Sequence, residues 1–152
     1  MNIHIENQQK KVKLNRRRIR RVVHQLKKVL ECADQEISLL IVDNERIREM
    51  NRQYLNRDYP TNVISFPLRE GDYGHINSQI LGDIVISAER AFQDAAASDL
   101  SFDDEIDFLI IHGLLHLLGY NHEVGDEDEA RIMKEQENAV FFLLNGYELE
   151  RD

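Results

Sequence analysis

Hydrophobic and polar residues alternate along the chain with two different periods, and the shorter period predicts strands. Ile3 and Ile5 alternate with polar residues in the segment NIHIEN, which is typical of a short strand. The runs ISLLIV at 37–42, NVISF at 62–66 and ILGDIVIS at 80–87 are rich in β-branched residues and predict three more strands. Pro67 is expected to close the third of these four strands.

The longer, helical period marks the segments between and after these strands. Asn15 is a candidate N-cap for a first helix, whose arginines lie opposite an apolar stripe. The residues of that stripe are Ile19, Val22, Val23, Leu26, Leu30 and Ala33. Asp43 is expected to cap a second helix with apolar positions at Ile47, Met50 and Tyr54.

Three more helices are predicted in the second half of the chain. The first is an alanine-rich helix at 88–98, and Ser101 is expected to cap another that runs to about Leu118. Gly119 is a natural stop for that helix, because glycine adopts the left-handed conformation readily. Asp126 and Glu129 form a capping-box pattern for a last helix that ends at Gly146.

The resulting order, βαβαββααα, predicts the α/β (α+β) class. We expect a single domain over residues 1–152, with a small mixed four-stranded sheet packed against about five helices. Residues 68–79 have turn composition and no period. No internal repeat or linker divides the chain.

The composition of the chain bears on where in the cell the protein works. Cys32 is the only cysteine, which excludes an internal disulfide and a Cys-x2-Cys zinc pair. The N-terminal residues are polar where a signal peptide would be apolar, and no apolar run approaches the ~20 residues of a membrane span. We therefore expect a cytoplasmic protein without a membrane partner.

The charge is distributed unevenly. The net charge is −9, but residues 1–28 hold ten Lys and Arg against one acid, which leaves +9 there and −18 over the remainder. A phosphate backbone responds to such a local patch. From charge alone, a solvated helix face is the favoured interpretation and RNA contact is the alternative.

Three histidines, His112, His116 and His122, lie in the stretch HGLLHLLGYNH. The helix around the first two is apolar on nearly all sides and is expected to be buried. His112 and His116 are four residues apart and share one face, and Gly119 permits the turn that would bring His122 to the same point. Three neutral imidazoles hold zinc and leave a fourth position for water, as in catalytic zinc sites. We predict one zinc ion per chain; the alternative is three unrelated core histidines.

The histidine spacing, with a glycine after the second histidine, is similar to that of the metzincin zinc proteases. Those enzymes carry a glutamate general base directly after the first histidine. Gly113 stands at that position here, which removes the ordinary protease mechanism. A glycine inside a helix costs about 1 kcal/mol relative to alanine. Its presence indicates either close approach of another group to the backbone or tight helix packing.

The histidine stretch followed by DEDE, together with DYPTNVISFP and LGDIVIS, resembles the YbeY family of bacterial rRNA maturation factors. The resemblance spans roughly residues 36–147 with all blocks in order, whereas the first 35 residues match only in their strand-then-helix plan. It implies a zinc-dependent, single-strand-specific endoribonuclease. The implied roles are rRNA processing, notably at the 3′ end of small-subunit rRNA, and ribosome quality control. The implied partners are rRNA and the small ribosomal subunit, without a nucleotide cofactor.

Two positions depart from the family pattern. Asn121 stands where aspartate is common before the third histidine, and Leu55 stands where some members carry arginine. Arg57 is then the nearest cation that could bind a phosphate. No side chain is assigned as nucleophile or general base. Zinc lowers the pKa of its bound water to ~7, so either that water or the 2′-OH of RNA is expected to attack.

Other polar residues are candidates for supporting roles. Asp83 lies between apolar neighbours and is expected to be at least partly buried, either as an acceptor for a histidine ligand or as a cap for a helix or loop. Thr61, Asn62 and Ser65 could line a substrate groove, or they could be turn residues at a strand entry. Asp126, Glu127, Asp128 and Glu129 are expected to favour the last helix dipole.

Two other functions compete with the endoribonuclease. One is a ribosome-assembly binding factor with a structural zinc and a basic helix that contacts RNA or protein. The other is a metallopeptidase-like hydrolase, which the missing glutamate disfavours. A fourth protein ligand to the metal would favour the binding factor, and an open position would favour the enzyme.

Overall fold

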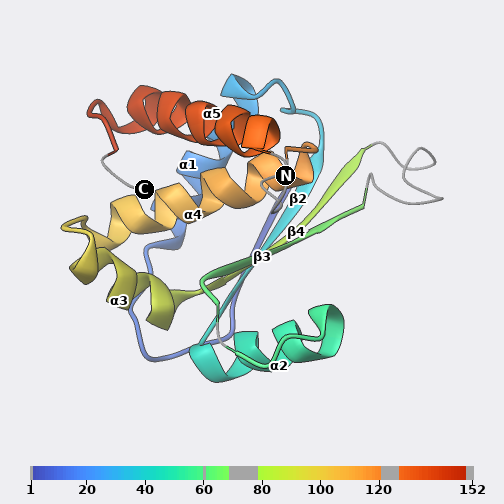
Figure 1. The fold of residues 1–152 in the computed structure, drawn as a ribbon, viewed down its shortest axis with the longest axis vertical. Helices are drawn as coiled ribbons and strands as arrows, with labels where there is room; N and C mark the ends of the chain where they lie inside the picture. The colour runs from blue at the N-terminus through green and yellow to red at the C-terminus, as the bar shows by residue number, and fades with distance from the viewer. Residues whose placement is uncertain (1, 60, 69–78, 121–126, 150–152) are drawn as a thin grey trace.

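The computed structural model describes residues 2–59, 61–68, 79–120 and 127–149, and its elements follow the predicted order. The elements are β1 (Ile3–Asn7), α1 (Arg16–Val29), β2 (Glu36–Val42), α2 (Asn44–Leu55), β3 (Val63–Pro67), β4 (Ile80–Ser87), α3 (Ala88–Ala97), α4 (Phe102–Leu117) and α5 (Glu127–Asn145). Within the described residues they form one four-stranded sheet and five helices (Figure 1). The predicted fold class is confirmed.

The sheet is mixed, with the strand order β1-β2-β4-β3. β1, β2 and β4 are parallel, and Ile3 pairs with Ile37 at the start of the β1–β2 ladder. β3 is the exception, because it returns antiparallel to β4 and places Val63 opposite Ile86. β2 and β4 therefore form the centre of the sheet, and β3 is the edge strand nearest α4.

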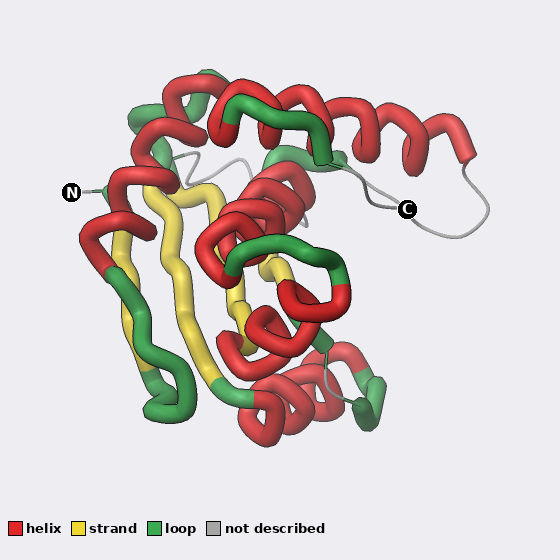
Figure 2. Tube along the Cα trace, turned by 90° about the vertical axis from the view of Figure 1, so that its left-hand side faces the viewer, coloured by secondary structure: helices red, strands yellow, loops and turns green. Residues whose placement is uncertain are grey.

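Helices cover the two faces of the sheet unequally (Figures 1 and 2). α1, α4 and α5 share one large core with residues such as Ile37 and Ile84 of the central strands. α2 covers part of the opposite face, where Ile47 and Met50 pack in a smaller cluster with Val85. Ala88 and Ala91 of α3 belong to the large core as well. Within the described residues, this side of the sheet holds most of the buried apolar residues and positions α4 against β3 and β4.

The predicted helix ends are confirmed where the structure describes them. The side chains of Asn15, Asp43 and Ser101 each accept a hydrogen bond from a backbone N–H three residues later, at 3.1, 2.9 and 3.1 Å. Gly119 and Gly146, just after α4 and α5, have φ of +100° and +78°. Asp126, the predicted cap of α5, lies outside the described residues.

Two residues of the predicted apolar helix faces are exposed. Ala33 is exposed, because the chain leaves α1 at Leu30 and the neighbouring Cys32 takes the buried place instead. Tyr54 is 57 % exposed at the end of α2, although its ring still packs edge-on against Phe66 with centroids 5.6 Å apart.

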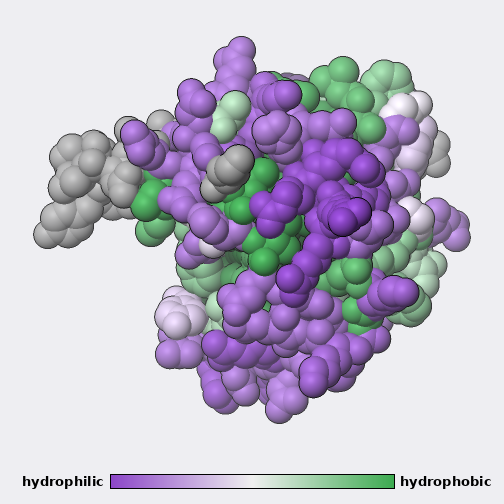
Figure 3. All heavy atoms as spheres, turned by 180° about the vertical axis from the view of Figure 1, so that it is seen from behind, coloured by the Kyte–Doolittle hydropathy of each residue, from purple (hydrophilic) through white to green (hydrophobic). Residues whose placement is uncertain are grey.

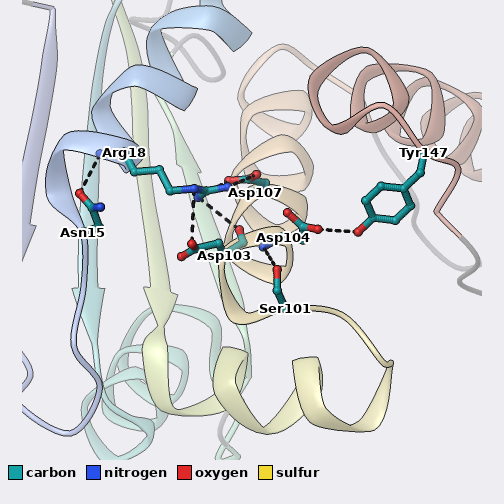
Figure 4. A network of polar contacts seen from close by, with 7 residues as sticks. All are labelled: Asn15, Arg18, Ser101, Asp103, Asp104, Asp107 and Tyr147. Carbon is teal, nitrogen blue, oxygen red and sulfur yellow. Dashed lines mark hydrogen bonds and ion pairs between the residues drawn. The ribbon is translucent and has the colours of Figure 1, made fainter.

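A network of polar contacts joins α1 to the first half of α4 (Figure 4). The guanidinium of Arg18 donates two hydrogen bonds to the carboxylate of Asp107, at 3.0 and 2.7 Å, and lies 3.6 Å from Asp103. Burial raises the pKa of Asp107, and the hydrogen bond and charge of Arg18 partly offset that rise. Tyr147, after α5, donates to Asp104 at 2.6 Å. The network therefore fixes α1, α4 and the chain after α5 relative to one another.

The rear of the molecule, where α1 lies, is mainly hydrophilic, with smaller hydrophobic patches between the polar side chains (Figure 3). Among the basic residues of α1, Arg16, Arg17, Arg20 and Arg21 are exposed. Arg18 is only partly exposed because of its contact with Asp107. None of the helices in the described part of the chain has the length and apolarity needed to cross a bilayer.

Candidate metal-binding site

α4 places two of the three predicted ligands. Ser101 caps its N-terminus, and three acidic residues in its first turn favour the positive end of the helix dipole. The helix then enters the core, and ten of its sixteen residues are buried. His112 and His116 lie in its second half, one turn apart, and both are half-buried.

The two imidazoles converge. The Nε2 atoms of His112 and His116 are 3.2 Å apart, and the ring planes meet at 75° with centroids separated by 4.7 Å. Two nitrogens that share one tetrahedral zinc at about 2.1 Å each are separated by about 3.4 Å. The observed separation suits joint coordination, and it also suits a hydrogen bond between the two rings. The donor set therefore fits a zinc ion.

His122, the third predicted ligand, lies outside the described residues, as do Asn121 and the following acids up to Asp126. Among the residues that the structure does describe, no group of three or more His, Cys, Asp or Glu side chains is placed to hold a metal. The three-histidine zinc site thus stays a prediction, and its described portion is the pair on α4.

A glutamate that sequence analysis did not identify completes the surroundings of His112. Oε1 of Glu137, on α5, lies 2.7 Å from Nδ1 of His112, and Glu137 is only 8 % exposed. The sequence carried a signal for it. Glu137 interrupts the buried stripe of α5 that includes Met133, Val140 and Phe141. A carboxylate at a core position requires a partner, because an unpaired buried charge is strongly unfavourable.

Gly113, next to the first histidine, faces the sheet. A Cβ added there would lie 2.8 Å from Cγ2 of Ile84 on β4. The Ser65 hydroxyl of β3 also donates to the Gly113 carbonyl at 3.2 Å. Of the two explanations offered by the sequence, tight packing of the helix is therefore the one that the structure supports. Ser65 points at α4 and is not among the residues that line the cleft beside His112.

A cleft of about 340 Å³ opens beside His112. It lies between the start of β3, the middle of α4 and the middle of α5. Its polar lining comprises Asn62, His112, Lys134, Glu137 and Asn138, and Phe108 and Met133 are among its apolar lining residues. The structure thus brings the predicted RNA contact Asn62 to the same cleft as a predicted metal ligand. Lys134 and Asn138 were not identified from sequence.

The other two predicted site residues lie elsewhere. Arg57 is exposed after α2 and is not among the residues that line this cleft, so its contact with RNA stays a prediction. Asp83 was a candidate either as an acceptor for a histidine ligand or as a cap for a helix or loop. The first of these roles is wrong, and so is the expected burial of the residue as a whole. It is exposed, and strand alternation sends it to the α2 face while its neighbours Gly82 and Ile84 face α4.

Asp83 lines a second hollow, on the α2 face, with Tyr54 and Phe66 among its other lining residues. Partial desolvation of its carboxylate raises the pKa of Asp83 even though the residue as a whole is exposed. The sheet itself therefore separates this carboxylate from the histidines of α4.

Fold and site together define a class of protein: an α/β protein with a histidine-based candidate metal site on a buried helix, beside an open polar cleft. Comparison with known proteins gives the family. The family described as Endoribonuclease YbeY matches residues 4–145. The chain belongs to the YbeY endoribonuclease family.

Relatives in several bacteria match nearly the whole chain. The Endoribonuclease YbeY of Syntrophus aciditrophicus is 54% identical over 150 residues, which cover 99% of this chain and 94% of the relative. That of Geobacter sulfurreducens is 42% identical over 146 residues, which cover 96% and 97%. The solution structure of TM1509 from Thermotoga maritima is similar with a TM-score of 0.65 and 25% identity, over 95% of this chain and 89% of that one.

Proposed function

We propose that this protein is a zinc-dependent endoribonuclease that cleaves single-stranded RNA. The observation that carries the proposal is the convergence of the His112 and His116 Nε2 atoms, 3.2 Å apart, with His112 facing an open polar cleft. Membership of the YbeY endoribonuclease family supports the reaction class. Its substrate would be ribosomal RNA, with roles in maturation of the small-subunit 3′ end and in ribosome quality control in the cytoplasm.

The residues of the cleft have separate tasks in this proposal. His112 and His116, with His122 as the third ligand, would hold one zinc ion, which supplies a Lewis acid for a phosphoryl oxygen when bound. Lys134 carries the positive charge that would pair with a backbone phosphate. The amides of Asn62 and Asn138 can both donate to and accept from RNA bases or 2′-hydroxyls. Arg57 would contact the strand outside the cleft.

The geometry offers no glutamate general base next to the first histidine. Gly113 faces Ile84, so the corresponding position of a zinc protease points into the sheet here. Glu137 is bound at Nδ1 of His112, the ring nitrogen that does not face His116. Phosphodiester cleavage tolerates this arrangement better than peptide cleavage does, since RNA supplies its own 2′-OH nucleophile.

The test is cleavage of a fluorescent single-stranded fragment of small-subunit rRNA by protein reconstituted with zinc. We expect His116→Ala to abolish cleavage. The control is His24→Ala, at an exposed histidine on α1, which should cleave as fast as the wild type. The same fragment annealed to its complement should resist cleavage. If His116→Ala cleaves as fast as the wild type, the proposal is wrong. If the wild-type protein binds the fragment without cutting it, the binding-factor alternative is favoured.

A further inference from the structure

α5 contributes one acidic side chain to the core, and that side chain contacts a proposed metal ligand. Glu137 is 8 % exposed, and its Oε1 lies 2.7 Å from Nδ1 of His112. Neighbouring positions of the same helix face, Met133, Val140 and Phe141, are apolar and buried. A hydrophobic residue at position 137 would continue that face, so packing alone does not account for a glutamate there.

The contact determines how His112 can act. An ionised carboxylate only accepts hydrogen bonds, so Nδ1 of His112 must carry the proton in this contact. In a neutral imidazole the other nitrogen, Nε2, is then unprotonated, and its lone pair can bind a metal ion or accept a hydrogen bond. This Nε2 is the atom that lies 3.2 Å from Nε2 of His116.

We propose that Glu137 is a positioning residue, which holds His112 in the Nδ1–H tautomer and keeps its Nε2 directed at the metal position. The inference rests on the proposed metal-binding function of the site. It makes α5 a part of the metal centre, in addition to its role in covering α4. Carboxylates that accept from a ligand histidine in this way also raise the basicity of the ligand nitrogen.

The position of Glu137 is itself held by packing on both sides. Met133, four residues before it, is 1 % exposed, and Phe141, four residues after it, is fully buried. The Phe141 ring packs edge-on against Tyr147, with centroids 5.3 Å apart, and Tyr147 donates to Asp104 at the start of α4. α5 is thus fixed to α4 at these points, and Glu137 itself is buried and hydrogen-bonded to His112, so little further side-chain freedom is lost when a metal binds.

Zinc affinity tests the proposal without RNA. We expect Glu137→Ala to weaken zinc binding by 10–100-fold in competition with a chromophoric chelator, which is the usual effect of losing such a partner. Glu137→Gln keeps the size and an accepting oxygen, so its loss should be smaller. Glu135→Gln is the matched control, because Glu135 is an exposed carboxylate on the same helix that pairs with Arg131. It should bind zinc as the wild type does.

The tautomer of His112 provides a second readout that a purely structural role would not change. Long-range ¹H–¹⁵N NMR spectra of the zinc-free protein should show the Nδ1–H form of His112 in the wild type. The Nε2–H form should gain population in Glu137→Ala and, to a lesser degree, in Glu137→Gln. Circular dichroism would verify that the variants are folded, and the isosteric Gln variant keeps the test valid if the Ala variant unfolds.

The proposal is overturned if folded Glu137→Ala binds zinc within twofold of the wild type, or if the wild-type tautomer is Nε2–H. Its failure can be told apart from failure of the proposed function. Wild-type protein that cleaves RNA, with Glu137→Ala binding zinc normally, would remove only the role of Glu137. Zinc binding that depends on Glu137 in a protein that cuts no RNA would remove only the nuclease.

Discussion

The backbone of Gly113 lies directly against the side chain of Ile84, because a Cβ at position 113 would lie 2.8 Å from Cγ2 and 3.1 Å from Cδ1 of Ile84. Cγ2 is attached to the Ile84 Cβ and cannot swing away as the end of a long side chain could. Position 113 is therefore a contact point between α4 and the sheet. A side chain there would separate the two elements before it could reach the cleft beside His112.

We expect Gly113→Ala to lower the free energy of unfolding by about 1 kcal/mol. Overpacking costs about 1–3 kcal/mol, and the gain in helix propensity offsets up to about 1 kcal/mol of it. Gly113→Glu should be more destabilising, since it also buries a charge. Urea unfolding gives the values, and the penalty of Gly113→Ala should shrink in an Ile84→Ala background. An equal penalty in both backgrounds would show that Ile84 is not the cause.

The Arg18–Asp107 pair gives a second prediction on stability. The carboxylate side chain is 1 % exposed and the arginine side chain 18 %, so Arg18→Ala would leave a buried charge without its main partner. We expect a loss of about 3 kcal/mol in the free energy of unfolding. Adding Asp107→Asn should recover part of the loss, because a neutral amide is less unfavourable when buried. Arg17→Ala, at an exposed neighbour, should change stability by less than about 0.5 kcal/mol. A double variant no more stable than Arg18→Ala would contradict the argument.

Some arginines of α1 serve the fold and others are available to bind RNA, so the two roles of the helix can be tested separately. Arg18 binds Asp107, and Arg20 donates to the carbonyl of Ile3 at 2.8 Å, so both stabilise the fold. Arg16, Arg17 and Arg21 are exposed and are the suitable set to change. We expect their reversal to Glu to weaken RNA binding and to lower the slope of log K against log salt by up to about 3.

The matched control makes the same change in net charge on α2, at Arg46, Arg48 and Arg52, all of which are exposed. Fluorescence anisotropy at several salt concentrations measures both quantities. If the α2 variant loses as much affinity as the α1 variant, the effect comes from net charge. If neither loses affinity, the basic residues of α1 form a solvated helix face.

Tyr147 predicts a loss of stability at alkaline pH. Burial and the hydrogen bond to Asp104 raise the pKa of Tyr147 from 10.0 to about 12. Between these values the folded state keeps the phenol proton while the unfolded state releases it. The contribution of Tyr147 to the free energy of unfolding is therefore fully present below pH 10 and is lost as the pH rises to 12. Because Tyr147 is 40 % exposed, solvent screening reduces the effect to about 1 kcal/mol.

The measurement compares the wild type with Tyr147→Phe by urea unfolding at pH 9.5 and at pH 11.5. The wild type should lose about 1 kcal/mol more than the variant between the two conditions. A parallel loss in both proteins would mean that the phenol does not titrate differently in the folded state.

The elements of the fold were predictable because their signals are local. Alternating β-branched residues mark the strands, and the capping residues Asn15, Asp43 and Ser101 act within one helical turn of their own position. The same locality holds for His112 and His116, because the spacing of four residues alone places both on one helix face. These features depend only on residues within about one helical turn of one another and need no tertiary contact.

Features that depend on the partner of a side chain were not predictable in this way. Glu137 and His112 are 25 residues apart, and Arg18 and Asp107 are 89 apart. Nothing in either local sequence specifies which residue lies opposite. Asp83 failed for a related reason. Its apolar neighbours predicted burial. Side chains alternate between the two faces of a strand, however, and only the sheet topology shows which face of β4 is covered by α4.

The order in which the chain is made bears on when the site exists. α5 is the last helix in the described order, and its Glu137 has to pack behind a histidine of α4 before His112 is fixed in place. β2 likewise has to wait for β4, its central neighbour, which follows α2 and β3 in the chain. The fixed orientation of His112 is therefore a late product of folding, because it requires α4 to be seated on the assembled sheet and α5 to be seated on α4.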